Sequence, residues 1–263
     1  MDHHFSWYSL LPFYGNLHEY LQQNYAFTVV FSSRGIFPDI KTIATVDHIY
    51  AALFINVILC SIGLSVYLKT KDVKNFTIPS KKVSLVNILE IYYEIVRTVI
   101  KDILGDKYKL HISFIGSLGL FILFANVVGL FPGLPACTGN LNTTFACGLS
   151  VFIYFNYYGF KVHGLGHIGH LANPIGSWWG WFLAPLFLPI EGIGLLVRPF
   201  SLGIRLAGNM IGDHSVMTAF ASLSPLLLPL PFFFFGLVVS IIQAFVFCLL
   251  TSIYISLHTS EAH

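Results

Sequence analysis

The sequence predicts an all-α integral membrane protein with about three transmembrane helices, an amphipathic surface helix and two long, strongly tilted membrane-embedded helices. Of the 263 residues, 56% are hydrophobic and only 10% are charged, whereas a soluble domain carries roughly 25% charged residues. Several uncharged runs are long enough to cross a bilayer as helices. A net charge of +2 gives no indication of a nucleic-acid partner.

The predicted elements divide into an N-terminal segment outside the membrane and one membrane domain. The outside segment covers residues 1–47, and the membrane domain covers 48–263. Uncharged or nearly uncharged runs predict spans at about 49–68, 112–131 and 143–160.

Residues 84–104 have a different pattern. Apolar side chains recur there at helical spacing, and polar side chains such as Asn87, Glu90 and Glu94 fall opposite. This pattern predicts an amphipathic helix that lies on a membrane surface or against a partner.

The loops set the orientation. Nine cations lie between the first and second spans: Lys69, Lys71, Lys74, Lys81, Lys82, Arg97, Lys101, Lys107 and Lys109. The loop 132–142 has no charge. The positive-inside rule therefore puts 69–109 and the C-terminus in the cytoplasm, and the 132–142 loop and N-terminus outside. Cys137 and Cys147 flank this loop and could pair in an oxidising compartment, which the sequence leaves open.

The apolar stretch 178–223 is too long for one upright helix, since it would extend about 69 Å at about 1.5 Å per residue. Two vertical helices could meet near Arg198 and Pro199, or long helices could lie tilted in the membrane. The first alternative puts Arg198 and Arg205 at the outer face, against the positive-inside tendency, so the second is favoured. Residues 232–257 predict the last helix.

Polar residues in the stretch 178–223 gather on one helical face. Taking Arg205 as reference at about 100° per residue, Arg198 lies about 20° away and Asn209 about 40° away. Asp213 follows at about 80°, and Ser201 and Gly212 lie within about 40° on the other side. The pairs Gly203/Ala207 and Gly208/Gly212 are small enough for another helix to approach closely.

A charge at this depth indicates function. An arginine at mid-bilayer costs at least about 2.5–3.5 kcal/mol, so we expect a functional role for Arg205 and for the acid Glu191. For Arg198, beside a proline, snorkelling to headgroups or capping a turn remains open. His214, about 180° from Arg205, could relay protons or form an ordinary hydrogen bond. Gln243 could likewise only bond a neighbouring helix.

Three histidines, His163, His167 and His170, have a spacing that could suit a metal on a helix. The glycines between them argue against a helix, so a solvated loop is favoured. No metal site and no cofactor are expected.

Two motifs together resemble subunit a of the F-type ATP synthases. They are RPFSLGIRLAGNM (198–210) and IQAFVFCLLTSIYISLHTSEAH (242–263), and GNLNTT (139–144) and FNYYGFKVHGLG (155–166) are similar to bacterial members. The resemblance runs from residue 40 onward. It implies a non-catalytic stator in the bacterial inner membrane, without cofactors. The implied partners are a ring of c subunits with membrane carboxylates, the peripheral-stalk b subunits, the lipid bilayer and, indirectly, the F1 sector.

The resemblance also assigns residues. Arg205 matches the essential arginine that faces the ring, Asn209 and Gln243 match polar residues beside it, and Glu191 matches an acid that lines one of two offset half-channels. Asp213 and His214 are expected on the proton pathway, with secondary roles for Arg198, Ser201 and Asn142. One departure is Gly236, which stands where some relatives have a titratable partner for the residue matching His214.

Two other functions remain as alternatives. In a self-contained ion channel or secondary transporter, Arg205 would bind an anionic substrate, but the two similar halves typical of transporters are not evident. In an assembly scaffold, lysine could replace Arg205 without consequence. The choice between H⁺ and Na⁺ is left open by the sequence.

Overall fold

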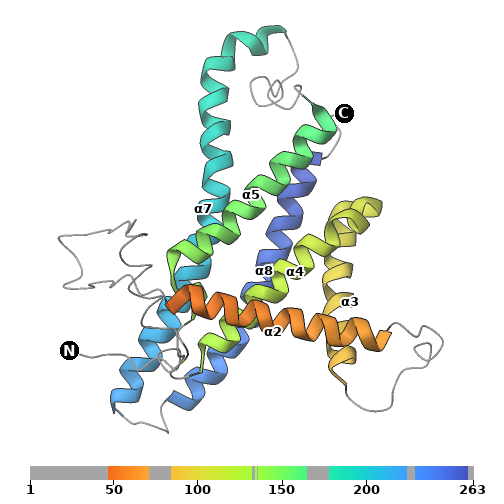
Figure 1. Ribbon diagram of the computed structural model, residues 1–263. Helices are drawn as coiled ribbons and strands as arrows, with labels where there is room; N and C mark the ends of the chain where they lie inside the picture. The colour runs from red at the N-terminus through yellow and green to blue at the C-terminus, as the bar shows by residue number, and fades with distance from the viewer. Residues whose placement is uncertain are drawn as a thin grey trace, which may run out of the picture.

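The computed structural model describes residues 47–70, 84–131, 134, 136–164, 178–223 and 229–259, with backbone alone at 47, 178–188, 222 and 223. The helices are α2 (Asp47–Thr70), α3 (Leu85–Leu104), α4 (Tyr108–Gly129), α5 (Leu141–His163), α7 (Trp178–Leu223) and α8 (Pro229–Thr259) (Figure 1). Short 3-10 turns form η3 (Gly105–Lys107) and η4 (Cys137–Gly139). No strand occurs in these ranges, and the prediction of an all-α membrane protein is confirmed.

Within the described residues, three helical stretches are long and apolar enough to cross a membrane: 48–70, 85–129 and 229–259. The second joins α3 to α4 through Gly105, whose φ of 57° is readily adopted only by glycine. Helix α5, over the predicted span 143–160, is long enough at 23 residues. Its asparagine, threonine and tyrosine side chains make it less apolar than the other three.

Helix α7 is continuous over 46 residues, which corresponds to about 69 Å. It runs without a turn through Arg198 and Pro199. The alternative of two vertical helices meeting at this point is therefore wrong, and a long helix must tilt to stay within a hydrocarbon core about 30 Å thick. A proline is tolerated inside a membrane helix where neighbouring groups satisfy the freed carbonyl.

The core is formed where α3, α4, α5 and α7 surround α8 (Figure 1). Its fully buried side chains include Ile122 of α4, Phe155 of α5, Leu206 of α7 and Phe247 of α8. Helix α2 lies across this bundle and packs on α4 and η4 through a small second cluster.

Small residues bring α5 and α7 close together. A Cβ added at Gly148 would stand 2.6 Å from the backbone oxygen of Pro199. A Cβ at Gly203 would stand 3.3 Å from the backbone oxygen of Thr144. The predicted small pair Gly203/Ala207 therefore lies on the buried side of α7, where Gly203 packs against α5.

Hydrogen bonds hold the loop between α4 and α5. Thr138 donates to the buried side chain of Asn126 at 2.8 Å. The side chain of Asn140 caps α5 by accepting from the backbone N–H of Asn142 at 2.9 Å. Cys137 and Cys147 are free thiols, and burial raises the pKa of Cys137 to about 12. The possible disulfide is therefore not formed.

We expect Gly148→Ala to destabilise the protein by about 1–3 kcal/mol, because its methyl group meets rigid backbone rather than a movable side chain. The measurement is the free energy of unfolding in detergent. Gly63→Ala is the matched control, since nothing lies within 4 Å of its added Cβ. This control should be neutral or gain up to about 1 kcal/mol. Equal effects of the two substitutions would contradict the close contact of α5 and α7.

Candidate functional site

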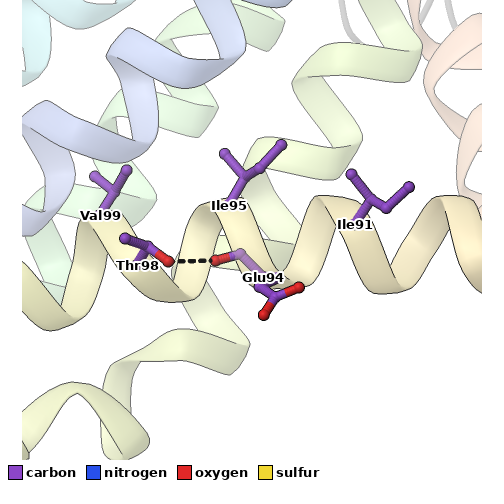
Figure 2. Close-up of a pocket in the computed structure, with 5 residues that line it drawn as sticks. All are labelled: Ile91, Glu94, Ile95, Thr98 and Val99. Atoms are coloured by element: carbon purple, nitrogen blue, oxygen red, sulfur yellow. Dashed lines mark hydrogen bonds between the residues drawn. The ribbon is translucent and has the colours of Figure 1, made fainter.

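The pocket drawn in Figure 2 lies on one face of α3 and contains none of the predicted site residues. Ile91, Ile95 and Val99 point the same way from the helix, and Thr98 donates to the backbone oxygen of Glu94 at 2.9 Å. All five lining residues belong to this single helix. The apolar side chains of this face suit lipid or a partner helix, and Glu94 is the one ionisable group among the five lining residues.

The predicted residues instead lie along α7 and α8, which run antiparallel. The polar contacts between these helices follow one another in reverse order. Asp213 lies near Gly236, Asn209 bonds Gln243, and Arg198 reaches His258. An amide pair therefore lies between an acidic end and a basic end.

The amide pair consists of Asn209 and Gln243. The side-chain nitrogen of Asn209 donates to Oε1 of Gln243 at 2.9 Å. Gln243 is buried with 5% exposure, while Asn209 is exposed at the surface of α7. The structure thus brings together two residues that lie far apart in the sequence, and it fixes one amide in the interface and the other at its edge.

Arg205 is exposed one helical turn before Asn209. Within the described part of the chain, its guanidinium forms no hydrogen bond and no ion pair. Its neighbours Ile204 and Ile211 are exposed, and a Cβ at Gly208 or Gly212 would have nothing within 4 Å. An apolar surface with room for another helix therefore surrounds a cation that lacks a counter-charge.

At the acidic end, Asp213 and His214 face different helices. The Oδ2 atom of Asp213 lies 3.8 Å from the position of a Cβ at Gly236 on α8. The imidazole of His214 lies beside the backbone of Gly129 on α4. Leu130 is closer still, with Cδ2 at 2.8 Å, so Asp213 supplies the nearest polar atom but not the nearest side chain.

At the basic end, four residues form what we call the Arg198 cluster: Glu191, Arg198, Tyr254 and His258. Nη2 of Arg198 lies 3.7 Å from Oε1 of Glu191, with side-chain exposures of 23% and 50%. Nη1 lies 3.3 Å from Nε2 of His258, and the guanidinium lies 5.6 Å from the ring centre of Tyr254. Arg198 thus has partners within the protein, whereas snorkelling had remained open.

Two members of this cluster, Tyr254 and His258, were not predicted as site residues. They stand four residues apart in the last turns of α8, so they share one face. The only sequence signal was a histidine close to a helix C-terminus, in a motif already chosen for Gln243. Ser201 donates to the backbone oxygen of Arg198 at 2.9 Å and so stays within α7.

The remaining predicted residues lie elsewhere. Asn142 stands exposed at the start of α5, where its backbone N–H joins the cap. His163 ends α5, and His167 and His170 lie outside the described residues. Among the residues that the structure describes, no group of three histidine, cysteine, aspartate or glutamate side chains could hold a metal ion.

An all-α membrane chain with charged and amide side chains along two long packed helices has the features of an ion-translocating protein. The comparisons with known proteins agree. Residues 49–256 match the family described as ATP synthase A chain. The chain is 44% identical over 177 residues to ATP synthase subunit a of Geobacter sulfurreducens, covering 67% of this chain and 75% of that one.

Two further relatives carry the same name. In Bdellovibrio bacteriovorus the identity is 40% over 187 residues, 71% of this chain and 80% of the relative. In Sorangium cellulosum it is 37% over 224 residues, 83% and 86%. The chain belongs to the ATP synthase A chain family.

Family membership defines the general function of the protein. The protein is a multi-pass, proton-translocating subunit of the F0 sector of a rotary ATP synthase, and it is not itself catalytic. It works in a complex with other ATP synthase subunits. A self-contained channel or transporter does not fit this membership.

The amide pair can be tested by a double-mutant cycle with Asn209→Leu and Gln243→Leu. We expect a coupling free energy of about 0.6 kcal/mol and at most about 1.7 kcal/mol, the range of interhelical hydrogen bonds in membranes. The measurement is the unfolding free energy of the single and double variants in detergent. Strict additivity of the two single effects would mean that the bond between α7 and α8 does not form.

Proposed function

We propose that Arg205 is the fixed positive charge that couples proton transfer to rotation of a ring of c subunits. The observation that carries the proposal is the exposed guanidinium, without a counter-charge in the described chain, beside open space at Gly208 and Gly212. A ring helix with a carboxylate fits this surface in size and in charge.

Two half-channels would reach this surface from opposite sides. Glu191 lies 14 residues before Arg205, about 21 Å along a helix, and Asp213 lies eight residues after it, about 12 Å. Acids at these two positions can exchange protons with water from either side. Because the entry points are offset along α7, a proton can cross only by riding on the ring.

The chemistry follows from the fixed charge. A protonated ring carboxylate is neutral and tolerates lipid, whereas an ionised one does not. The guanidinium never deprotonates at working pH, so a carboxylate that approaches it is driven to the charged form. The carboxylate must therefore release its proton to one half-channel before it passes Arg205, and it takes a proton from the other afterwards.

The amide pair supports this role. Asn209 stands one turn from Arg205, and its bond to Gln243 anchors this part of α7 on α8.

Each elementary charge that crosses 100 mV releases about 2.3 kcal/mol, which ring rotation can carry to distant catalytic sites. The same charge at Arg205 opposes a direct leak of cations between the half-channels.

The orientation is also proposed from the positive-inside rule. Residues 69–109, which hold the nine cations, are called the lysine-rich segment. Nζ of Lys107 in this segment lies 3.3 Å from the backbone oxygen of Thr259 at the end of α8. The Arg198 cluster would then face the cytoplasm, and Asp213 would lie toward the outside. The N-terminal segment 1–47 would lie outside a bacterial inner membrane, with 48–263 as the membrane domain.

Further partners follow from the same proposal. The peripheral-stalk b subunits would hold the protein still against the ring, and the F1 sector would contact it only indirectly. The exposed apolar residues Ile88, Ile91 and Ile95 of α3 provide a surface for lipid or for such a stalk helix.

Arg205→Ala tests this proposal in the complete complex in inverted membrane vesicles. We expect ATP-driven proton pumping to fall at least about tenfold, because no fixed charge then ionises the ring carboxylate. Arg205→Lys should also pump less, since lysine lacks the rigid guanidinium fork. Arg97→Ala, at an exposed arginine of α3, is the control and should pump normally.

The amount of assembled complex in the membrane must be measured alongside pumping. Full coupled pumping by an assembled Arg205→Ala complex would contradict the proposal. Normal pumping by Arg205→Lys would instead favour a scaffold role.

A further inference from the structure

His258 is a buried histidine that the proposed proton pathway does not use. Only 7% of its surface is exposed, and its ring packs on Phe155 of α5 with centroids 4.4 Å apart. Nδ1 lies 2.8 Å from the backbone oxygen of Tyr254. Nε2 lies 3.3 Å from Nη1 of Arg198.

These two contacts define the protonation state of the ring. A backbone oxygen only accepts, so Nδ1 carries the hydrogen and donates it to Tyr254. A guanidinium only donates, so Nε2 is the unprotonated nitrogen that accepts from Arg198. A ring with one donating and one accepting nitrogen is neutral.

A second proton on His258 is incompatible with this arrangement. It would bring two N–H donors, each on a positive group, face to face across 3.3 Å. Arg198 cannot give up its own proton. The contact between His258 and Arg198 therefore exists only while the histidine is neutral.

Release of Arg198 would reach Glu191, because the guanidinium holds both groups. Its Nη2 lies 3.7 Å from the Glu191 carboxylate. Helix α8 would stay in place, since Lys107 contacts the backbone oxygen of Thr259 at 3.3 Å and Ser256 donates to that of Ile103 at 3.4 Å.

Other titratable and charged groups surround this helix end. On the elements packed around it, within the described residues, they include Tyr254 of α8, His111 of α4, Tyr154, Tyr158 and Lys161 of α5, Lys101 and Asp102 of α3, and Asp106 and Lys107 of η3. His111 is already engaged with Tyr154 at 3.1 Å. Glu191 is the one carboxylate bound to Arg198 in the described chain.

We propose that His258 is a pH-sensitive positioning residue, which in its neutral form holds Arg198, and through it Glu191, in the arrangement that passes protons. Protonation of His258 releases Arg198 and disturbs that arrangement. The inference rests on the proposed place of Glu191 in a half-channel. It makes the α8 end of the pathway responsive to pH on the side where the lysine-rich segment lies.

The test uses the complete complex in inverted vesicles, with protons pumped per ATP hydrolysed measured from about pH 7.5 to about pH 6.0. A second proton can bind His258 only when its contact with Arg198 breaks, so the neutral form that holds Arg198 becomes rarer as the pH falls. We therefore expect the number of protons pumped per ATP to drop toward the acid end of this interval in the unmodified complex. His258→Gln keeps an acceptor without titrating, so its profile should be flat.

Two further variants separate the cause. His258→Arg imitates the protonated ring and should pump poorly at every pH. Arg198→Gln removes the group that His258 holds, so its profile should be low and flat. His163→Gln, at the end of α5, is the matched control and should keep the drop of the unmodified complex.

An unmodified complex without the drop, or a His258→Gln complex that keeps it, would overturn the inference. So would normal pumping by His258→Arg at about pH 7.5. If His258→Gln does not assemble, Arg198→Gln provides the test. A drop in pumping at low pH that persists in Arg198→Gln would also overturn the inference. Arg205→Ala in the same vesicles separates the two proposals. If Arg205→Ala still pumps, the proposed function is wrong. If Arg205→Ala does not pump but His258→Gln has the same pH profile as the unmodified complex, only the role of His258 is wrong.

Discussion

A guanidinium that stays charged on an apolar membrane helix is the constraint on which this structure depends. Such a charge costs at least about 2.5–3.5 kcal/mol at mid-bilayer. The protein must therefore hold it at a surface that a counter-charge on another subunit can approach. Leu202, Leu206 and Met210 anchor one side of α7 in the core, which leaves Arg205 on the other. The arginine therefore stands on a fixed helix face, and in our account the moving partner supplies the carboxylate.

Helix α7 is kept rigid by contacts of different kinds along its length. Near its middle, Gly148 of α5 meets the backbone of Pro199, so the two helices touch without intervening side chains. Farther along, the bond from Asn209 to Gln243 fixes the distance to α8. Toward its start, Arg198 joins Glu191 to the last turn of α8. Rigidity matters because a fixed charge can favour ionisation of a passing carboxylate only while their separation is controlled.

Local pattern predicted the helices and the face that carries Arg205, because both follow from periodicity along one segment. The fold class is confirmed, and the continuous α7 agrees with the length argument. Contacts between residues far apart in the sequence are harder to predict from local pattern. The resemblance put Asn209 and Gln243 near each other, but pattern alone could not show that Asp213 supplies the polar atom nearest Gly236. The role of His258 could not be predicted, because it depends on the contact with Arg198, 60 residues earlier.

The role of Arg205 requires that the surface beside it meets a ring subunit, and cross-linking can test this contact. Gly208→Cys places a thiol three residues from Arg205, on an exposed position with open space. In the complete complex, a short thiol-to-carbon photo-cross-linker attached there should join the protein to a c subunit, identified by mass spectrometry. The exposed native Cys60 on α2 serves as the internal control and should give no such product. If the complex assembles and pumps but Gly208→Cys gives no c-subunit product, the ring does not pass this surface of α7.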